Sequence, residues 1–86
     1  MNLSKQQIDA ISNLGLAHMG DCVFEILCRS YLCAKGETTV DRLHRDTIAM
    51  VKATGLEALF GALYLAGRTE RINELFKAVM EGSYGI

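Results

Sequence analysis

Three carboxylates stand out because they lie in stretches that are otherwise apolar: Asp21, Glu25 and Glu57. Asp21 and Glu25 are four residues apart, on one face of a helix, whereas Glu57 begins a second apolar stretch. An unpaired carboxylate is costly to bury. Carboxylates from two helices can hold Mg²⁺, which needs only one or two of them and keeps its waters for a substrate phosphate. A cation bound in this way activates water for phosphodiester hydrolysis.

Each of these carboxylates also has a structural alternative. Asp21 could cap the helix that follows it, and Glu25 could pair with Arg29 one helical turn later. Glu57 could complete a capping box with Thr54. Spacing alone favours these structural roles and leaves the metal-binding role open.

The two histidines carry less information. His18 lies three residues before Asp21 and could join an acidic site, but magnesium prefers oxygen ligands. A lone histidine is more often a surface or supporting residue, and His44 is interpreted in the same way. The sequence has no nucleophile–histidine–acid arrangement and no glycine-rich phosphate loop, so no other enzyme class is indicated.

The three cysteines, Cys22, Cys28 and Cys33, are spaced six and five residues apart. This spacing fits neither a Cys-x-x-Cys metal pattern nor an even set of disulfides. We interpret them as reduced cysteines that act as small core residues. Reduced thiols are typical of the cytoplasm.

The composition predicts an all-α fold in a single domain over residues 1–86. The chain has no proline, half of its residues are hydrophobic and 22% are charged. No apolar run is long enough for a membrane span, and the polar start contains no signal-peptide core, so we expect a soluble, cytoplasmic protein. The net charge of −1 indicates no strong general attraction to nucleic acid.

Start and stop signals divide the chain into five helical segments. A capping box formed by Ser4 and Gln7 begins the first segment, and Gly15 and Gly20 suggest a bend or helix junction before Asp21. Gly36 and Gly67 are placed to end helices, and we expect the last five residues to fray. The later helices are expected at Asp21–Ala34, about Thr39–Ala53, Leu56–Ala66 and about Thr69–Glu81.

The expected helix Asp21–Ala34 is apolar on nearly every face, which is more than a small chain can cover by itself. We therefore expect a two-fold homodimer with a largely hydrophobic interface. The candidate interface residues are Val23, Phe24, Leu27 and Tyr31.

Two segments resemble the ribonuclease III domain. Leu16-Ala-His-Met-Gly-Asp-Cys-Val-Phe-Glu25 is similar to the signature segment of that domain, Phe-Leu-Gly-Asp-Ala-Val, and Glu57-Ala-Leu-Phe-Gly-Ala-Leu-Tyr-Leu65 is similar to its second acidic segment. Leu43-His44 also fits a helix that follows the first motif. The two motifs occur in the order of the family, and the resemblance covers nearly the whole chain.

Two departures from the full ribonuclease III pattern favour its short bacterial branch, Mini-ribonuclease III, which lacks a double-stranded RNA-binding domain. Ala17 and Thr54 occupy positions where the full pattern has acidic residues, and this branch shares both departures. The resemblance therefore assigns catalytic and metal-binding roles to Asp21 and Glu57, whereas Glu25 has no catalytic counterpart.

The resemblance implies a homodimeric, Mg²⁺-dependent endoribonuclease that cleaves double-stranded RNA and matures the ends of the 23S ribosomal RNA precursor. Chains of this branch carry a further segment between the two motifs, whereas here Ala53 runs directly into Thr54. A segment is thus expected to be missing at the 53/54 junction. Because such a segment would contact RNA, the alternative is a non-catalytic helical dimerisation or RNA-binding module that keeps the ribonuclease III core.

Overall fold

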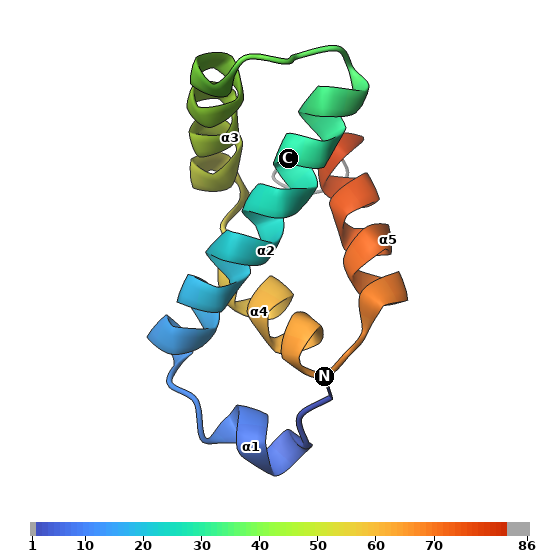
Figure 1. The fold of residues 1–86 in the computed structure, drawn as a ribbon. Helices are drawn as coiled ribbons and strands as arrows, with labels where there is room; N and C mark the ends of the chain where they lie inside the picture. Colours follow the sequence, from blue (N-terminus) through green and yellow to red (C-terminus); the bar gives the residue numbers. More distant parts are fainter. Residues whose placement is uncertain (1, 83–86) are drawn as a thin grey trace.

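A computed structural model describes residues 2–82, except for the side chains of residues 52–54, and all of its regular structure is helical. The predicted all-α class is therefore confirmed. Of the last five residues, which are expected to fray, residues 83–86 lie outside the described part of the chain, and Gly82 forms a turn with positive φ (76°). No helix in the described part is long and apolar enough to cross a membrane. The five helices, shown in Figure 1, are α1 (Lys5–Asp9), α2 (Asn13–Ala34), α3 (Val40–Thr54), α4 (Glu57–Leu65) and α5 (Thr69–Met80).

Helix α2 is the central element of the fold. It crosses α4 near its N-terminal half, and α3 packs against it further along (Figure 1). Helix α5 packs against α4 and also reaches α2, where the ring of Phe76 lies 5.6 Å from that of Phe24. The short helix α1 is tied to the end of α4, because Leu3 N–H donates to the carbonyl of Leu65 at 2.7 Å.

The core lies where α2, α4 and α5 meet. Phe24 is fully buried and its ring packs 5.2 Å from that of Phe60. Ile72 and Leu75 of α5 are buried beside them, and Phe76 and Val79 pack against the cluster, so one apolar stripe of α5 faces the core.

The expectation that α2 begins at Asp21 is wrong. The helix begins at Asn13, where Ser12 is the N-cap and its hydroxyl accepts a hydrogen bond from Gly15 N–H at 3.0 Å. The expected bend between Leu14 and Asp21 is absent. Gly20 lies inside the helix and does not interrupt it. Because glycine has no side chain, α4 can approach α2 closely at this position. Asp21 therefore lies in the interior of α2 and cannot cap it.

The capping box expected at Thr54 is also wrong. Thr54 is the last residue of α3, which ends at Gly55 in the left-handed conformation (φ 67°). Helix α4 begins at Glu57, and its N-cap, Leu56, makes no side-chain capping hydrogen bond. Glu57 remains favourably placed, since a carboxylate in the first turn interacts well with the helix dipole.

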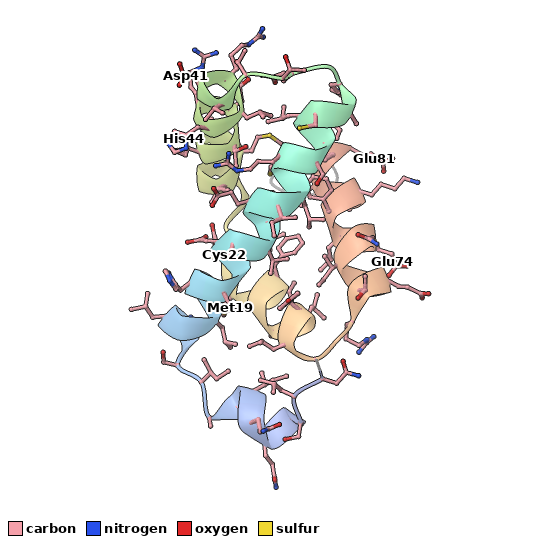
Figure 2. The ribbon with its side chains drawn as sticks, viewed as in Figure 1. Met19, Cys22, Asp41, His44, Glu74 and Glu81 are labelled. Atoms are coloured by element: carbon pink, nitrogen blue, oxygen red, sulfur yellow. The ribbon has the colours of Figure 1, made fainter. Side chains whose placement is uncertain are left out.

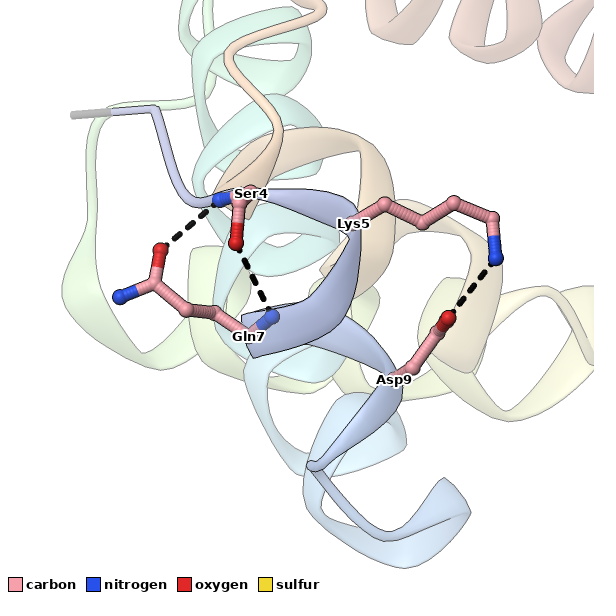
Figure 3. A network of polar contacts seen from close by, with 4 residues as sticks. All are labelled: Ser4, Lys5, Gln7 and Asp9. Carbon is pink, nitrogen blue, oxygen red and sulfur yellow. Dashed lines mark hydrogen bonds and ion pairs between the residues drawn. The ribbon is translucent and has the colours of Figure 1, made fainter.

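Three other predicted boundary signals are confirmed. Ser4 and Gln7 form a reciprocal capping box, with hydrogen bonds of 2.8 and 3.1 Å (Figure 3). Gly36 and Gly67 both follow helix ends with positive φ. In each case the next residue's N–H reaches back into the last turn, as when Glu37 donates to the Leu32 carbonyl at 3.1 Å.

The cysteines divide into one core residue and two surface residues. Only Cys28 is buried, whereas Cys22 and Cys33 are exposed, so the core interpretation is correct for Cys28 alone. Spacings of six and five residues place these side chains on different faces of α2. Burial, followed by the negative charge of Glu25, raises the pKa of the Cys28 thiol to about 11.

We expect two thiols of the native protein to react rapidly with a disulfide reagent at neutral pH, and the third to react only on unfolding. Cys28 is both inaccessible and protonated, and the thiolate is the reactive form. Ellman's reagent with and without denaturant measures this count, and Cys28→Ala should lose the slow phase alone. Three equally fast thiols would contradict the packing of α2.

Thr47 is fully buried on α3, and no partner for its hydroxyl oxygen is found among the described residues. An unsatisfied buried hydroxyl costs about 1–3 kcal/mol, and valine has nearly the same shape. We expect Thr47→Val to raise the free energy of unfolding by about 1 kcal/mol in urea denaturation. The exposed Thr38→Val is the control and should stay within about 0.5 kcal/mol of the parent. A destabilised Thr47→Val variant would show that the hydroxyl has a partner.

Candidate active site

Helices α2 and α4 touch backbone to backbone at two glycines. A Cβ atom added at Gly20 would lie 1.5 Å from the carbonyl oxygen of Glu57, and one added at Gly61 would lie 2.0 Å from that of Leu16. Real Cβ atoms essentially never come closer than 3.0 Å to such atoms. Only glycine at both positions permits this approach of the two helices.

This crossing brings together the two segments that carry the predicted site residues. Asp21 directly follows Gly20, and Glu57 supplies the carbonyl group against which Gly20 packs. Both acidic residues are half-buried. The backbones that carry them are thus adjacent although 36 positions separate them in the sequence. The convergence of the two carboxyl groups themselves remains a prediction.

The structural alternatives for Asp21 and Glu57 are both removed. Asp21 lies in the middle of α2, and no capping box forms at Glu57. Among the described side chains, neither carboxylate takes part in a hydrogen bond or an ion pair. Two half-buried carboxylates without a partner among the described side chains, carried on adjacent backbone at one helix crossing, are candidates for cation ligands.

Glu25 has the structural role that its spacing predicted. Its carboxylate accepts a hydrogen bond from Arg29 at 2.5 Å, one turn later on α2. Both side chains are partly exposed, so the pair contributes little to stability. Glu25 therefore has a structural partner among the described side chains, whereas Asp21 and Glu57 have none.

A second pair of acidic residues lies at the other end of the molecule. Burial, a hydrogen bond to Asp46 and the charge of Asp46 together raise the pKa of Glu37, against the opposing charges of Arg42 and Arg45. Arg42 lies 3.5 Å from Glu37, and Arg45 lies 3.5 Å from Asp46. Because both carboxylates have arginine partners, this cluster is a structural contact between α3 and the segment before it.

The donor set at the crossing fits magnesium. No group of three or more histidine, cysteine, aspartate or glutamate side chains is gathered in the described part of the chain. Magnesium needs only one or two carboxylates and keeps several waters. Asp21 and Glu57 together offer that number of oxygen ligands. His18 lines the same hollow as Asp21 but is not a preferred magnesium ligand.

Comparison with known proteins identifies relatives of one kind. The protein named Mini-ribonuclease 3 from Clostridium tetani is 28% identical over 123 residues, covering 90% of this chain and 82% of the relative. That from Thermoanaerobacter sp. is 26% identical over 87% of this chain and 84% of its own length. That from Enterococcus faecalis is 36% identical over 78% of this chain and 52% of its own length. No family model and no solved structure matches the chain.

An all-helical chain with these relatives belongs to the ribonuclease III family of endoribonucleases. The motifs at Asp21 and Glu57 agree with that assignment. Within the family, the chain is a member of the Mini-ribonuclease III branch.

The relatives contain residues that this chain lacks. The alignment with the Clostridium tetani protein is 123 residues long, whereas 90% of this chain is about 77 residues. About 46 aligned positions therefore have no counterpart here, and the Thermoanaerobacter protein gives about 45.

Proposed function

We propose that this protein is a magnesium-dependent endoribonuclease that cleaves double-stranded RNA, with Asp21 and Glu57 as the residues that hold the metal. The observation that carries the proposal is the glycine-mediated crossing of α2 and α4, which puts the two acidic residues on adjacent backbone, neither with a partner among the described side chains. The resemblance to Mini-ribonuclease III supplies the cellular role, maturation of the 23S ribosomal RNA precursor in the cytoplasm. The free cysteines agree with a reducing compartment.

The residues of the site have distinct tasks in this reaction. Asp21 and Glu57 supply oxygen ligands from two helices that the close crossing holds in a fixed relation. Magnesium bound there supplies activation of water and stabilisation of the leaving oxygen. Without a cation, the two carboxylates would repel the phosphodiester, so the chain's own charge makes the site dependent on metal.

We further propose that the active form is a homodimer assembled through an apolar groove of about 300 Å³ between α2, α4 and α5. Ile26 and Tyr64 border this groove with 67% and 52% of their surface exposed, and Val23 and Leu27 contribute to its wall. Large exposed apolar side chains gathered in one groove are typical of an interface. The sequence also predicts Phe24 as an interface residue. That prediction is wrong, because Phe24 is buried inside the subunit.

We expect Ile26→Glu to convert the dimer to a monomer in sedimentation velocity at micromolar concentration. The charge would have to be buried in the apolar interface, whereas in the monomer it would remain in solvent. The matched control is Val40→Glu on α3, which is 76% exposed but lies outside the groove and should leave the dimer intact. A parent protein that sediments as a monomer would contradict the proposed assembly.

The alternative function is a non-catalytic dimerisation or RNA-binding module. The observation that favours it is the absence of about 46 aligned positions, which we place at the 53/54 junction between α3 and α4. Duplex RNA is held largely through its phosphates, and the net charge of −1 gives little general attraction.

A cleavage assay distinguishes the two functions. The purified chain is first shown by mass spectrometry to have the 9.5 kDa of this sequence. A labelled RNA duplex and the corresponding single strand are then incubated with it, with and without Mg²⁺. The nuclease proposal predicts magnesium-dependent cuts in the duplex. An intact duplex that is bound but not cut would favour the non-catalytic module.

A further inference from the structure

The N-terminal half of α2 presents three different faces. Gly20 and Phe24 are buried against α4 and the core. The second face borders the apolar groove, and Figure 2 labels two of its residues, Met19 and Cys22. The third face lines a separate hollow. Its members are Leu14, Ala17, His18 and Asp21, joined by Ser12 and Gly15.

This hollow is suited to a ligand that approaches Asp21. Its volume of about 510 Å³ is within the usual range for small-molecule sites, about 300–1,000 Å³. Asp21 and His18 are one helical turn apart and both line it, so a molecule that contacts Asp21 in the hollow lies beside the His18 ring. Leu14 leaves 81% of its surface exposed at the same place.

We propose that this hollow binds the sugar–phosphate backbone of an RNA strand and that His18 is the residue that contacts it. The inference rests on the proposed nuclease function and assigns a substrate contact next to the metal-binding residue. His18 is exposed, and among the described side chains its ring makes no hydrogen bond or ion pair.

The chemistry of the hollow matches that ligand. An imidazole N–H can donate to a phosphate oxygen or to a ribose 2′-hydroxyl, and the ring face can stack on a base or sugar. Leu14 offers an apolar surface to the ribose carbons. Asp21 can only accept hydrogen bonds when ionised, so His18 supplies the donor that an anionic backbone needs.

The test uses the fact that the chain has only two histidines. Imidazole signals are recorded by NMR on the full chain while a short RNA duplex is added. Ca²⁺ replaces Mg²⁺ in the buffer, so that a hard cation neutralises the carboxylates while cleavage is suppressed. His44 is the internal control, because it is exposed on the outer side of α3, away from the hollow (Figure 2). The single-histidine variants His18→Gln and His44→Gln assign the two sets of signals.

The proposal predicts that the RNA duplex shifts the His18 signals and leaves those of His44 in place. It also predicts that His18→Ala, which removes the donor, weakens duplex binding about fivefold, the effect of one lost hydrogen bond, and His44→Ala less than twofold. Duplex binding with unmoved His18 signals would overturn this inference and leave the nuclease proposal standing. No duplex binding by the parent chain would overturn both.

Discussion

Replacing Asp21 by asparagine is expected to lower cleavage of double-stranded RNA by several orders of magnitude without unfolding the protein. Asparagine keeps the shape of the side chain and removes the charge that holds the cation, and metal activation of water is most of the mechanism. Because Asp21 has no hydrogen bond or ion pair with the described side chains, the change breaks none of these polar contacts, and thermal stability should stay the same or rise. The measurement is the initial rate of cleavage of a labelled duplex at saturating Mg²⁺.

The matched control for this variant is Glu25→Gln on the same helix. Glu25 is engaged with Arg29, so its loss should cost about 0.3–0.5 kcal/mol of stability and leave cleavage unchanged. Equal activity of Asp21→Asn and the parent would remove Asp21 from the site and favour the non-catalytic module.

Gly20→Ala is expected to have the largest effect on the fold itself. Its Cβ would lie 1.5 Å from the Glu57 carbonyl oxygen, and the backbone of α4 cannot yield as a flexible side chain could. Helices α2 and α4 would have to separate, which we expect to cost at least about 3 kcal/mol, at the upper end for overpacked sites. Urea denaturation followed by circular dichroism measures the loss.

The control for this second variant is Gly15→Ala in the same helix. A Cβ there would meet only side-chain atoms, Ile11 Cγ2 at 3.0 Å and Ser12 Oγ at 3.2 Å. The better helix propensity of alanine, about 1 kcal/mol, should offset that crowding. If Gly20→Ala were as stable as Gly15→Ala, the close crossing of α2 and α4 would be wrong.

The sequence predicted the elements of this fold better than it predicted where α2 begins. Gly36 and Gly67 end helices as expected, because their left-handed conformation is a local property. The local sequence predicts an interruption at Gly20, whereas this residue lies inside α2. The role of Gly20 depends on a contact with α4. A contact between segments that are distant in the sequence cannot be predicted from the spacing of neighbouring residues.

The same limit applies to the candidate site. The resemblance to ribonuclease III selected Asp21 and Glu57, but their spacing alone could not separate metal ligands from helix caps. The structure removed the capping roles by placing Asp21 inside α2 and Leu56 at the start of α4. Local spacing does not predict that Gly20 and Gly61 allow the two helices to cross closely. A usable signal is nevertheless present in the sequence, because Gly20 stands next to Asp21 in one apolar motif and Gly61 lies inside the other.

The central claim is that Asp21 and Glu57 hold one divalent cation between them. The most direct measurement is the anomalous diffraction of crystals soaked in Mn²⁺, which replaces magnesium and can be located by its signal. The account predicts a single peak that touches an oxygen of each carboxylate, with the two carboxyl groups about 4–8 Å apart and waters in the remaining positions. A peak bound to neither residue, or carboxyl groups on opposite faces of the subunit, would contradict it.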